Sequence, residues 1–124
     1  MTHQTMVHRT ASMERTYAAS PALVFRAWAD PDVRRLWGSP SEEVEIRNDA
    51  ADFRTGGEDR QTCLAGGEPV AVVKGHYHDI VTDRRIIYTE VISGPGGLLG
   101  MSLVSAEFVE AGVGTRLVLT LQTV

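Results

Sequence analysis

The stretch RTYAASPALVFRAWADP at Arg15–Pro31, followed by LWG at Leu36–Gly38, decides the fold because it ends a predicted strand and starts two helices. At Ser20–Pro21, the serine hydroxyl can cap free backbone amides. The proline occupies the first turn of the helix, where its missing N–H costs nothing. Asp30–Pro31 repeats this arrangement. The sequence therefore predicts a strand over 9–17 and two short helices directly after it.

Each predicted helix carries one apolar stripe at helical spacing. The stripe of the first helix consists of Val24, Ala27 and Trp28, with Phe25 beside it. The stripe of the second consists of Val33, Leu36 and Trp37. Because both helices are short, we expect them to lean on a sheet.

Strand-like segments separated by turn residues make up the rest of the chain. They cover residues 43–54, 58–64, 70–81, 84–92, 98–109 and 113–124. Residues 65–69 are expected to form a hairpin connection, and residues 93–97 are expected to form the longest flexible turn. A strand, two helices and about six further strands predict an α+β fold built on an antiparallel sheet.

Four later motifs add to the opening stretch: DFRTGG at 52–57, GxYxxI at 75–80, RxIIYT at 84–89 and GTRLVLT at 114–120. Their joint order resembles the bacterial relatives of the activator of heat-shock-protein-90 ATPase, in the START-like, helix-grip superfamily. The resemblance spans residues 13–123. It implies a curved antiparallel sheet of six to seven strands that grips a long C-terminal helix, with a cavity between sheet and helix.

We expect a flexible tail over residues 1–8 and a single START-like domain over residues 9–124. The sequence reaches Val124 in the last predicted strand, so the family's long C-terminal helix is missing from it. An apolar sheet face would then need another cover. It comprises Val104, Ala106, Phe108, Leu117, Leu119 and Leu121. Either the given sequence stops before the helix, or a partner chain replaces it. A chain ending at Val124 is expected to dimerise or aggregate through this face and to have low stability.

The composition is that of an ordinary globular protein, with 43% apolar and 23% charged residues. No apolar run approaches the roughly 20 residues of a membrane helix. The net charge of −4 and the scattered basic residues argue against a nucleic acid partner. Cys63 is the only cysteine, and the N-terminus lacks the features of an export signal. A cytoplasmic location is therefore expected.

Several motifs that could carry chemistry are interpreted as structural. His76 and His78 share a strand face, but two imidazoles make only half of a structural zinc site. Cys63 could be a nucleophile with His76, yet an isolated strand cysteine is more often a small apolar residue. DFRTGG lacks the Lys-Ser/Thr ending of a phosphate loop, so we interpret it as structural. Arg54 is expected to pair with a carboxylate, and the two glycines are expected to bend the chain. Gly114, in the later GTRL segment, is expected to close a hairpin. We expect no metal, no cofactor and no catalytic residues.

A ligand cavity is the sharper hypothesis, because aromatic side chains at the junction of short helices and a curved sheet can wall one. We expect its lining to be Trp28, Trp37, Phe53, His76, Tyr88, Glu90 and Met101. Tyr88 and Glu90 share a strand face and could orient a ligand's hydroxyl or amine. Burial there would raise the pKa of Glu90.

The leading functional interpretation is a non-enzymatic protein that binds or carries a small hydrophobic or amphipathic molecule. The resemblance and the lack of a catalytic constellation support it. A cochaperone-like interaction domain is one alternative. A cyclase or aromatase is another, in which Glu90, His76 and Tyr88 would be the acid and base groups.

Overall fold

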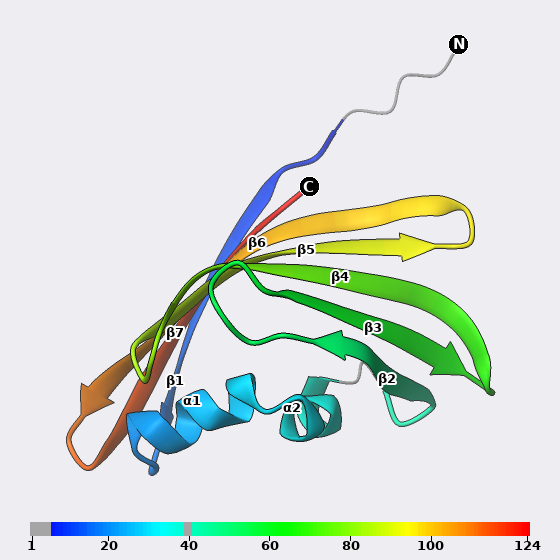
Figure 1. Cartoon of the computed structure of the whole chain (residues 1–124). Coiled ribbons are helices and arrows are strands. Elements are labelled where there is room, and N and C mark those ends of the chain that lie inside the picture. Colours follow the sequence, from blue (N-terminus) through cyan, green and yellow to red (C-terminus); the bar gives the residue numbers. More distant parts are fainter. Residues whose placement is uncertain (1–5, 39–40) are drawn as a thin grey trace.

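The computed structural model describes residues 6–38 and 41–124, with the backbone alone at residues 35–38. Seven strands form one antiparallel sheet, and two helices follow the first strand (Figure 1). The elements are β1 (Arg9–Tyr17), α1 (Pro21–Ala29), α2 (Pro31–Gly38), β2 (Val44–Ala51), β3 (Glu58–Ala65), β4 (Glu68–Val81), β5 (Arg85–Gly94), β6 (Gly97–Ala111) and β7 (Gly114–Thr123). The predicted α+β class and the predicted order of elements are confirmed.

The strand order in the sheet is β1-β7-β6-β5-β4-β3-β2. Strands β2 to β7 each pair with their neighbours in sequence, as a meander does. Strand β1 instead pairs with β7, from Arg9 opposite Thr123 to Tyr17 opposite Thr115. The two ends of the described chain therefore lie side by side (Figure 1).

The helix starts form as the sequence predicts. The Ser20 hydroxyl accepts a hydrogen bond from the Leu23 amide at 3.4 Å, and Pro21 is the first residue of α1. Asp30 Oδ1 accepts a hydrogen bond from the Asp32 amide at 2.9 Å, directly before α2. Neither described helix is long or apolar enough to cross a membrane.

Two connections are tighter than the sequence analysis expected. Strand β3 runs to Ala65 and β4 starts at Glu68, so only Gly66 and Gly67 form the turn. Both have positive φ, 59° and 80°, which suits a two-residue hairpin. Likewise β5 runs to Gly94 and β6 starts at Gly97. The expected long flexible turn is therefore two residues long.

The core lies between α1 and one face of the sheet, called here the inner face. Phe25 of α1 packs edge-on against Phe108 at 5.4 Å between ring centroids. Val24, Ala106 and Leu117 belong to the same buried cluster. Helix α1 therefore covers part of the apolar face of β6 and β7. For this part, the expectation that a cover must come from outside the sequence is wrong.

The remainder of the inner face is less covered. Leu119 and Leu121 of β7 are half-buried, and Met13, which lies opposite Leu119, is 48% exposed. All nine residues of β1 are exposed. Both helices lie toward one end of the sheet (Figure 1), which explains this gradient.

Gly114 closes the hairpin between β6 and β7, opposite Ala111, as the sequence analysis expected, and it has a second role. A Cβ at this position would lie 2.0 Å from the backbone oxygen of Tyr17, so only glycine fits. The positive φ of that hairpin belongs to Gly112 instead, at 61°. The adjacent Thr115 hydroxyl donates a hydrogen bond of 2.7 Å to the Ala19 carbonyl. Gly114 therefore allows the start of β7 to lie close against the end of β1.

Candidate functional site

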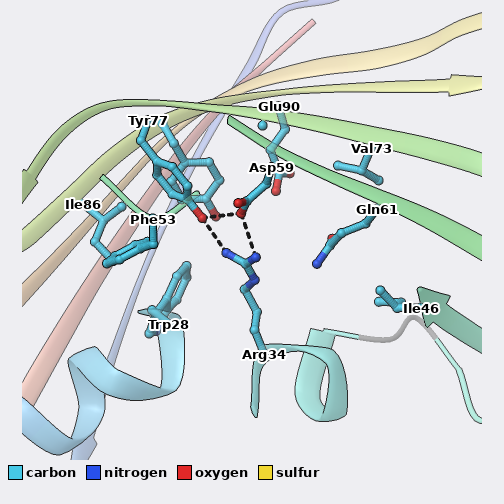
Figure 2. Close-up of a pocket in the computed structure, with 12 residues that line it drawn as sticks. Trp28, Arg34, Ile46, Phe53, Asp59, Gln61, Val73, Tyr77, Ile86 and Glu90 are labelled. Atoms are coloured by element: carbon cyan, nitrogen blue, oxygen red, sulfur yellow. Dashed lines mark hydrogen bonds and ion pairs between the residues drawn. The ribbon is translucent and has the colours of Figure 1, made fainter. Parts of the chain in front are cut away.

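A cavity of about 180 Å³ lies between the two helices and the inner face of strands β2 to β5. Ile46, Asp59, Gln61, Val73, Gly75, Tyr77, Ile86, Tyr88 and Glu90 come from these strands. Trp28 comes from α1, Arg34 from α2 and Phe53 from the loop after β2 (Figure 2). The site thus depends on the register of four strands and on the placement of both helices.

Aromatic rings form one continuous wall of the cavity. Phe53 and Tyr77 meet edge-on at 5.0 Å between ring centroids. Tyr77 lies 5.8 Å from Tyr88, and Tyr88 lies 6.5 Å from Trp28. Such offset and edge-on arrangements are the favoured ones for aromatic pairs. The wall is therefore apolar and well packed.

A buried polar cluster of Arg34, Asp59 and Tyr77 joins α2 to the sheet (Figure 2). Arg34 Nη2 lies 2.7 Å from Asp59 Oδ2, and Arg34 Nη1 donates a hydrogen bond of 2.5 Å to the Tyr77 hydroxyl. The Tyr77 hydroxyl in turn donates to Asp59 Oδ2. Each member of the cluster thus contacts the other two.

The electrostatics of this cluster reflect its burial. Burial alone would lower the pKa of Arg34, but nearby Tyr77 and Asp59 outweigh it and raise that pKa above its ordinary value. Burial, together with the bond donated to Asp59, raises the pKa of Tyr77 well above its usual range. Arg34 Nε is buried and has no hydrogen-bond partner among the described residues. At neutral pH the cluster therefore holds a charged guanidinium and a neutral phenol.

The loop between β2 and β3 places Phe53 at the cavity. Its bend requires Gly57, because a Cβ there would lie 2.0 Å from the Asp52 carbonyl oxygen. Gly56 N donates to the Tyr77 carbonyl at 2.8 Å, and Tyr77 N donates to the Gly57 carbonyl at 3.0 Å. Arg54 Nε pairs with Asp52 Oδ2 at 2.8 Å, which confirms the structural interpretation of DFRTGG.

Glu90 and Tyr88 bring polar groups into the cavity that have no hydrogen bond or ion pair within the described part of the chain. Glu90 lies opposite Gly75 on one neighbouring strand and Ser102 on the other. The positions directly opposite Glu90 on both neighbouring strands are therefore small residues. Burial raises the pKa of Glu90, and it raises the pKa of Tyr88 well above its usual range. Both groups are therefore available to a ligand.

Of the seven expected lining residues, the structure brings four together in this cavity: Trp28, Phe53, Tyr88 and Glu90. Trp37 lies in α2, but its side chain is outside the described part of the structure. His76 and Met101 do not line the cavity. Met101 is 43% exposed and borders a separate depression beside Thr123 and Val124.

His76 is on the opposite face of the sheet because successive strand residues point to opposite sides. It lies next to Tyr77, which faces the cavity. His76 and His78 stack at 4.7 Å between ring centroids, with Glu58 Oε1 3.5 Å from His76 Nδ1. Across residues 6–38 and 41–124, no group of three or more His, Cys, Asp or Glu side chains could hold a metal ion.

Cys63 cannot pair with His76 as a nucleophile and its base. The register places Cys63 opposite Ala71, whereas His76 lies opposite Glu58 near the other end of β3. Burial raises the pKa of the Cys63 thiol, which disfavours the reactive thiolate. The interpretation of Cys63 as a small residue in a strand stands.

The sequence analysis did not identify Arg34, Asp59 and Tyr77 as site residues. Tyr77 entered the sequence analysis only as part of the GxYxxI motif. The available signal was the alternation of β3, where Asp59 and Gln61 share a face with Cys63. Two polar side chains on the inner face of a strand indicate a buried polar site, but the partner of Asp59 depends on how α2 packs.

The chain is similar to one known protein family and to several solved structures. The family model described as activator of Hsp90 ATPase homolog 1-like protein matches residues 18–124. A crystal structure of a Rhizobium loti protein is 34% identical, with a TM-score of 0.81, over 94% of this chain and 79% of that one. A Rhizobium leguminosarum protein is 31% identical, with a TM-score of 0.81, over 94% and 77% of the two chains.

More distant structures share the same architecture. A Chromobacterium violaceum protein is 26% identical, with a TM-score of 0.81, and the match covers 93% of this chain and 79% of that one. A search of curated proteins found no match. The predicted START-like, helix-grip fold is therefore confirmed.

Proposed function

This chain belongs to the activator of Hsp90 ATPase homolog 1-like family, and we propose that it binds a small amphipathic molecule in the cavity between its helices and sheet. The observation that carries the proposal is an aromatic cavity with two polar groups, on Tyr88 and Glu90, that have no hydrogen bond within the described residues. Ligand sites are typically apolar with a few such polar groups that fix orientation. The lone Cys63 fits a reducing compartment, so we place this activity in the cytoplasm.

The size of the cavity limits the ligand. An engineered apolar cavity of about 150 Å³ holds one benzene molecule. A cavity of about 180 Å³ therefore suits one ring with a short substituent, rather than a long acyl chain or a polycyclic compound. The apolar walls would supply affinity through burial, at about 25 cal/mol per Å².

A variant that fills the cavity tests this proposal. Val73 lines the cavity, and the adjacent Val72 points to the opposite face of the sheet. Benzyl alcohol is titrated into each protein while backbone amide resonances are recorded by NMR. We expect Val73→Trp to abolish the shifts around Tyr77 and Tyr88, and the matched control Val72→Trp to retain them. Unchanged binding by Val73→Trp would place the ligand elsewhere and overturn the proposal.

The raised pKa of Glu90 favours a second candidate, an acid–base enzyme of the cyclase type. His76, which the sequence analysis grouped with Glu90 and Tyr88, faces the other side of the sheet and has no part in it. Glu90→Gln and Tyr88→Phe would distinguish the two functions. An enzyme would lose turnover of a ring substrate while retaining its binding, whereas a carrier would show no turnover in any form.

A further inference from the structure

We propose that the cavity selects a small ring compound bearing a protonated amine, with the ammonium group paired to the Glu90 carboxylate. This inference rests on the proposed function and names the chemical class of its ligand. It follows from the charges, the rings and the open space around Glu90.

The charges that line the cavity leave one carboxylate without a counterion. Arg34 and Asp59 neutralise each other at 2.7 Å, and the Tyr77 phenol is bonded to both. Glu90 has no ion pair among the described residues. A buried charge is costly unless it is paired, so the site with Glu90 ionised lacks one positive charge. A ligand with a single positive charge would supply it.

The walls suit a cation as well as a ring. Trp28, Phe53, Tyr77 and Tyr88 surround the space, and the faces of such rings attract ammonium groups within about 6 Å. Glu90 lies directly opposite Gly75 and Ser102 on the neighbouring strands, and its side chain lines the cavity. Figure 2 shows Glu90 close to Asp59, on the side of the cavity formed by the sheet.

An anionic ligand fits these observations less well. Arg34 is the only positively charged side chain that lines the cavity in the described part of the chain, and it is already bonded to Asp59 and Tyr77. A carboxylate ligand would have to displace one of these bonds. It would also lie in the same cavity as Glu90, whose charge would repel it.

The proposal predicts how acid affects binding. The charged and titratable groups that face Glu90 are Arg34 of α2, Asp59 of β3, Tyr77 of β4 and Tyr88 of β5. Burial raises the pKa of Glu90, so its carboxylate becomes protonated at a higher pH than an ordinary glutamate does. Affinity for a cation should therefore fall on acidification, while affinity for a neutral ring should not.

Four ligands of similar size separate the outcomes: benzylamine, benzyl alcohol, toluene and benzoate. Calorimetric titrations use the full chain, Glu90→Gln and the control Glu107→Gln, whose carboxylate is exposed on β6. We expect the unaltered protein to bind benzylamine about tenfold or more tightly than benzyl alcohol, as a charged hydrogen bond would give. Glu90→Gln should reduce this preference to within about threefold, while Glu107→Gln should retain it.

Other results would overturn the inference in distinguishable ways. Binding of toluene and benzyl alcohol without a preference for benzylamine would leave the proposed function standing and reject the amine. A preference for benzoate would indicate that Arg34, rather than Glu90, binds the polar group of the ligand. A benzylamine preference that survives in Glu90→Gln would reject Glu90 as the partner. Failure of all four ligands to bind would overturn both proposals. Retained affinity of Glu90→Gln for benzyl alcohol would show that the variant's cavity is intact.

Discussion

Arg34 and Asp59 form an ion pair of 2.7 Å that joins α2 to the sheet at the wall of the cavity. The two side chains are only 17% and 11% exposed, so water screens this pair weakly. The pair holds the second helix against the strands that carry the ligand groups. The stability of the fold and the shape of the site are therefore linked through one contact.

Replacing Asp59 should destabilise the protein because it leaves the Arg34 guanidinium buried without its counterion. Asp59→Asn is expected to lower the free energy of unfolding by about 3 kcal/mol. Chemical denaturation measures this change. The control is Asp79→Asn, whose side chain is 38% exposed and pairs with Arg85 at 2.7 Å, and this variant should cost less than about 1 kcal/mol. Equal costs for the two variants would show that burial of the Arg34 pair is unimportant.

The two tyrosines of the cavity should respond differently to loss of the hydroxyl group. Tyr77→Phe removes bonds to Arg34 and Asp59 and is expected to cost about 2 kcal/mol. Tyr88→Phe removes a hydroxyl with no hydrogen bond in the described part of the chain and should cost less than about 0.5 kcal/mol. Thermal and denaturant unfolding of both variants check this, and the opposite order would contradict the hydrogen-bond assignment.

Gly57 should tolerate no side chain. The Cβ of Gly57→Ala would lie 2.0 Å from the Asp52 carbonyl oxygen, so the loop must move and carry Phe53 with it. We expect a loss of about 2 kcal/mol or more in unfolding free energy. Gly96→Ala is the control, because nothing lies within 4 Å of the added Cβ. If both variants matched the unaltered protein, the bend of this loop would not depend on glycine.

Glu90 should make stability depend on pH with a defined sign. Its folded pKa is raised, so ionisation of Glu90 disfavours the folded state as the pH rises above the ordinary glutamate value of about 4.3. Glu90→Gln should therefore stabilise the free protein at about pH 7, and this gain should fade below about pH 4. Denaturation at both pH values tests the sign. A loss of stability at neutral pH would mean that the Glu90 carboxylate has a favourable partner.

The sequence predicted the fold well because its signals are local. The Ser20 and Asp30 caps, the prolines after them and the alternation of the strands each depend on a few neighbouring residues. Two turns were predicted to be longer than they are, because strand pairing continues up to the last residue that the backbone geometry allows. At Gly66 and Gly67, positive φ angles let the two strands continue to within two residues of each other.

The site was predictable only in part because its residues come from different elements. Tyr88 and Glu90 are predictable together because they share a strand face. His76 is not in the cavity because one residue along a strand reverses the face, and the adjacent Tyr77 lies there instead. Arg34 could not be assigned from the sequence, since its contact with Asp59 depends on how a helix packs on a distant strand.

The pairing of β1 with β7 has a consequence for the order in which the molecule can form. Strands β2 to β7 can assemble by successive hairpins, each of which closes a short loop. Of the seven described strands, β1 is made first, and it must wait because its partner in this sheet is β7, the last of the seven. Contacts between distant parts of a chain slow folding, since the loop must close before they form. Until β7 is in place, the newly made β1 has exposed backbone groups that another chain could pair with.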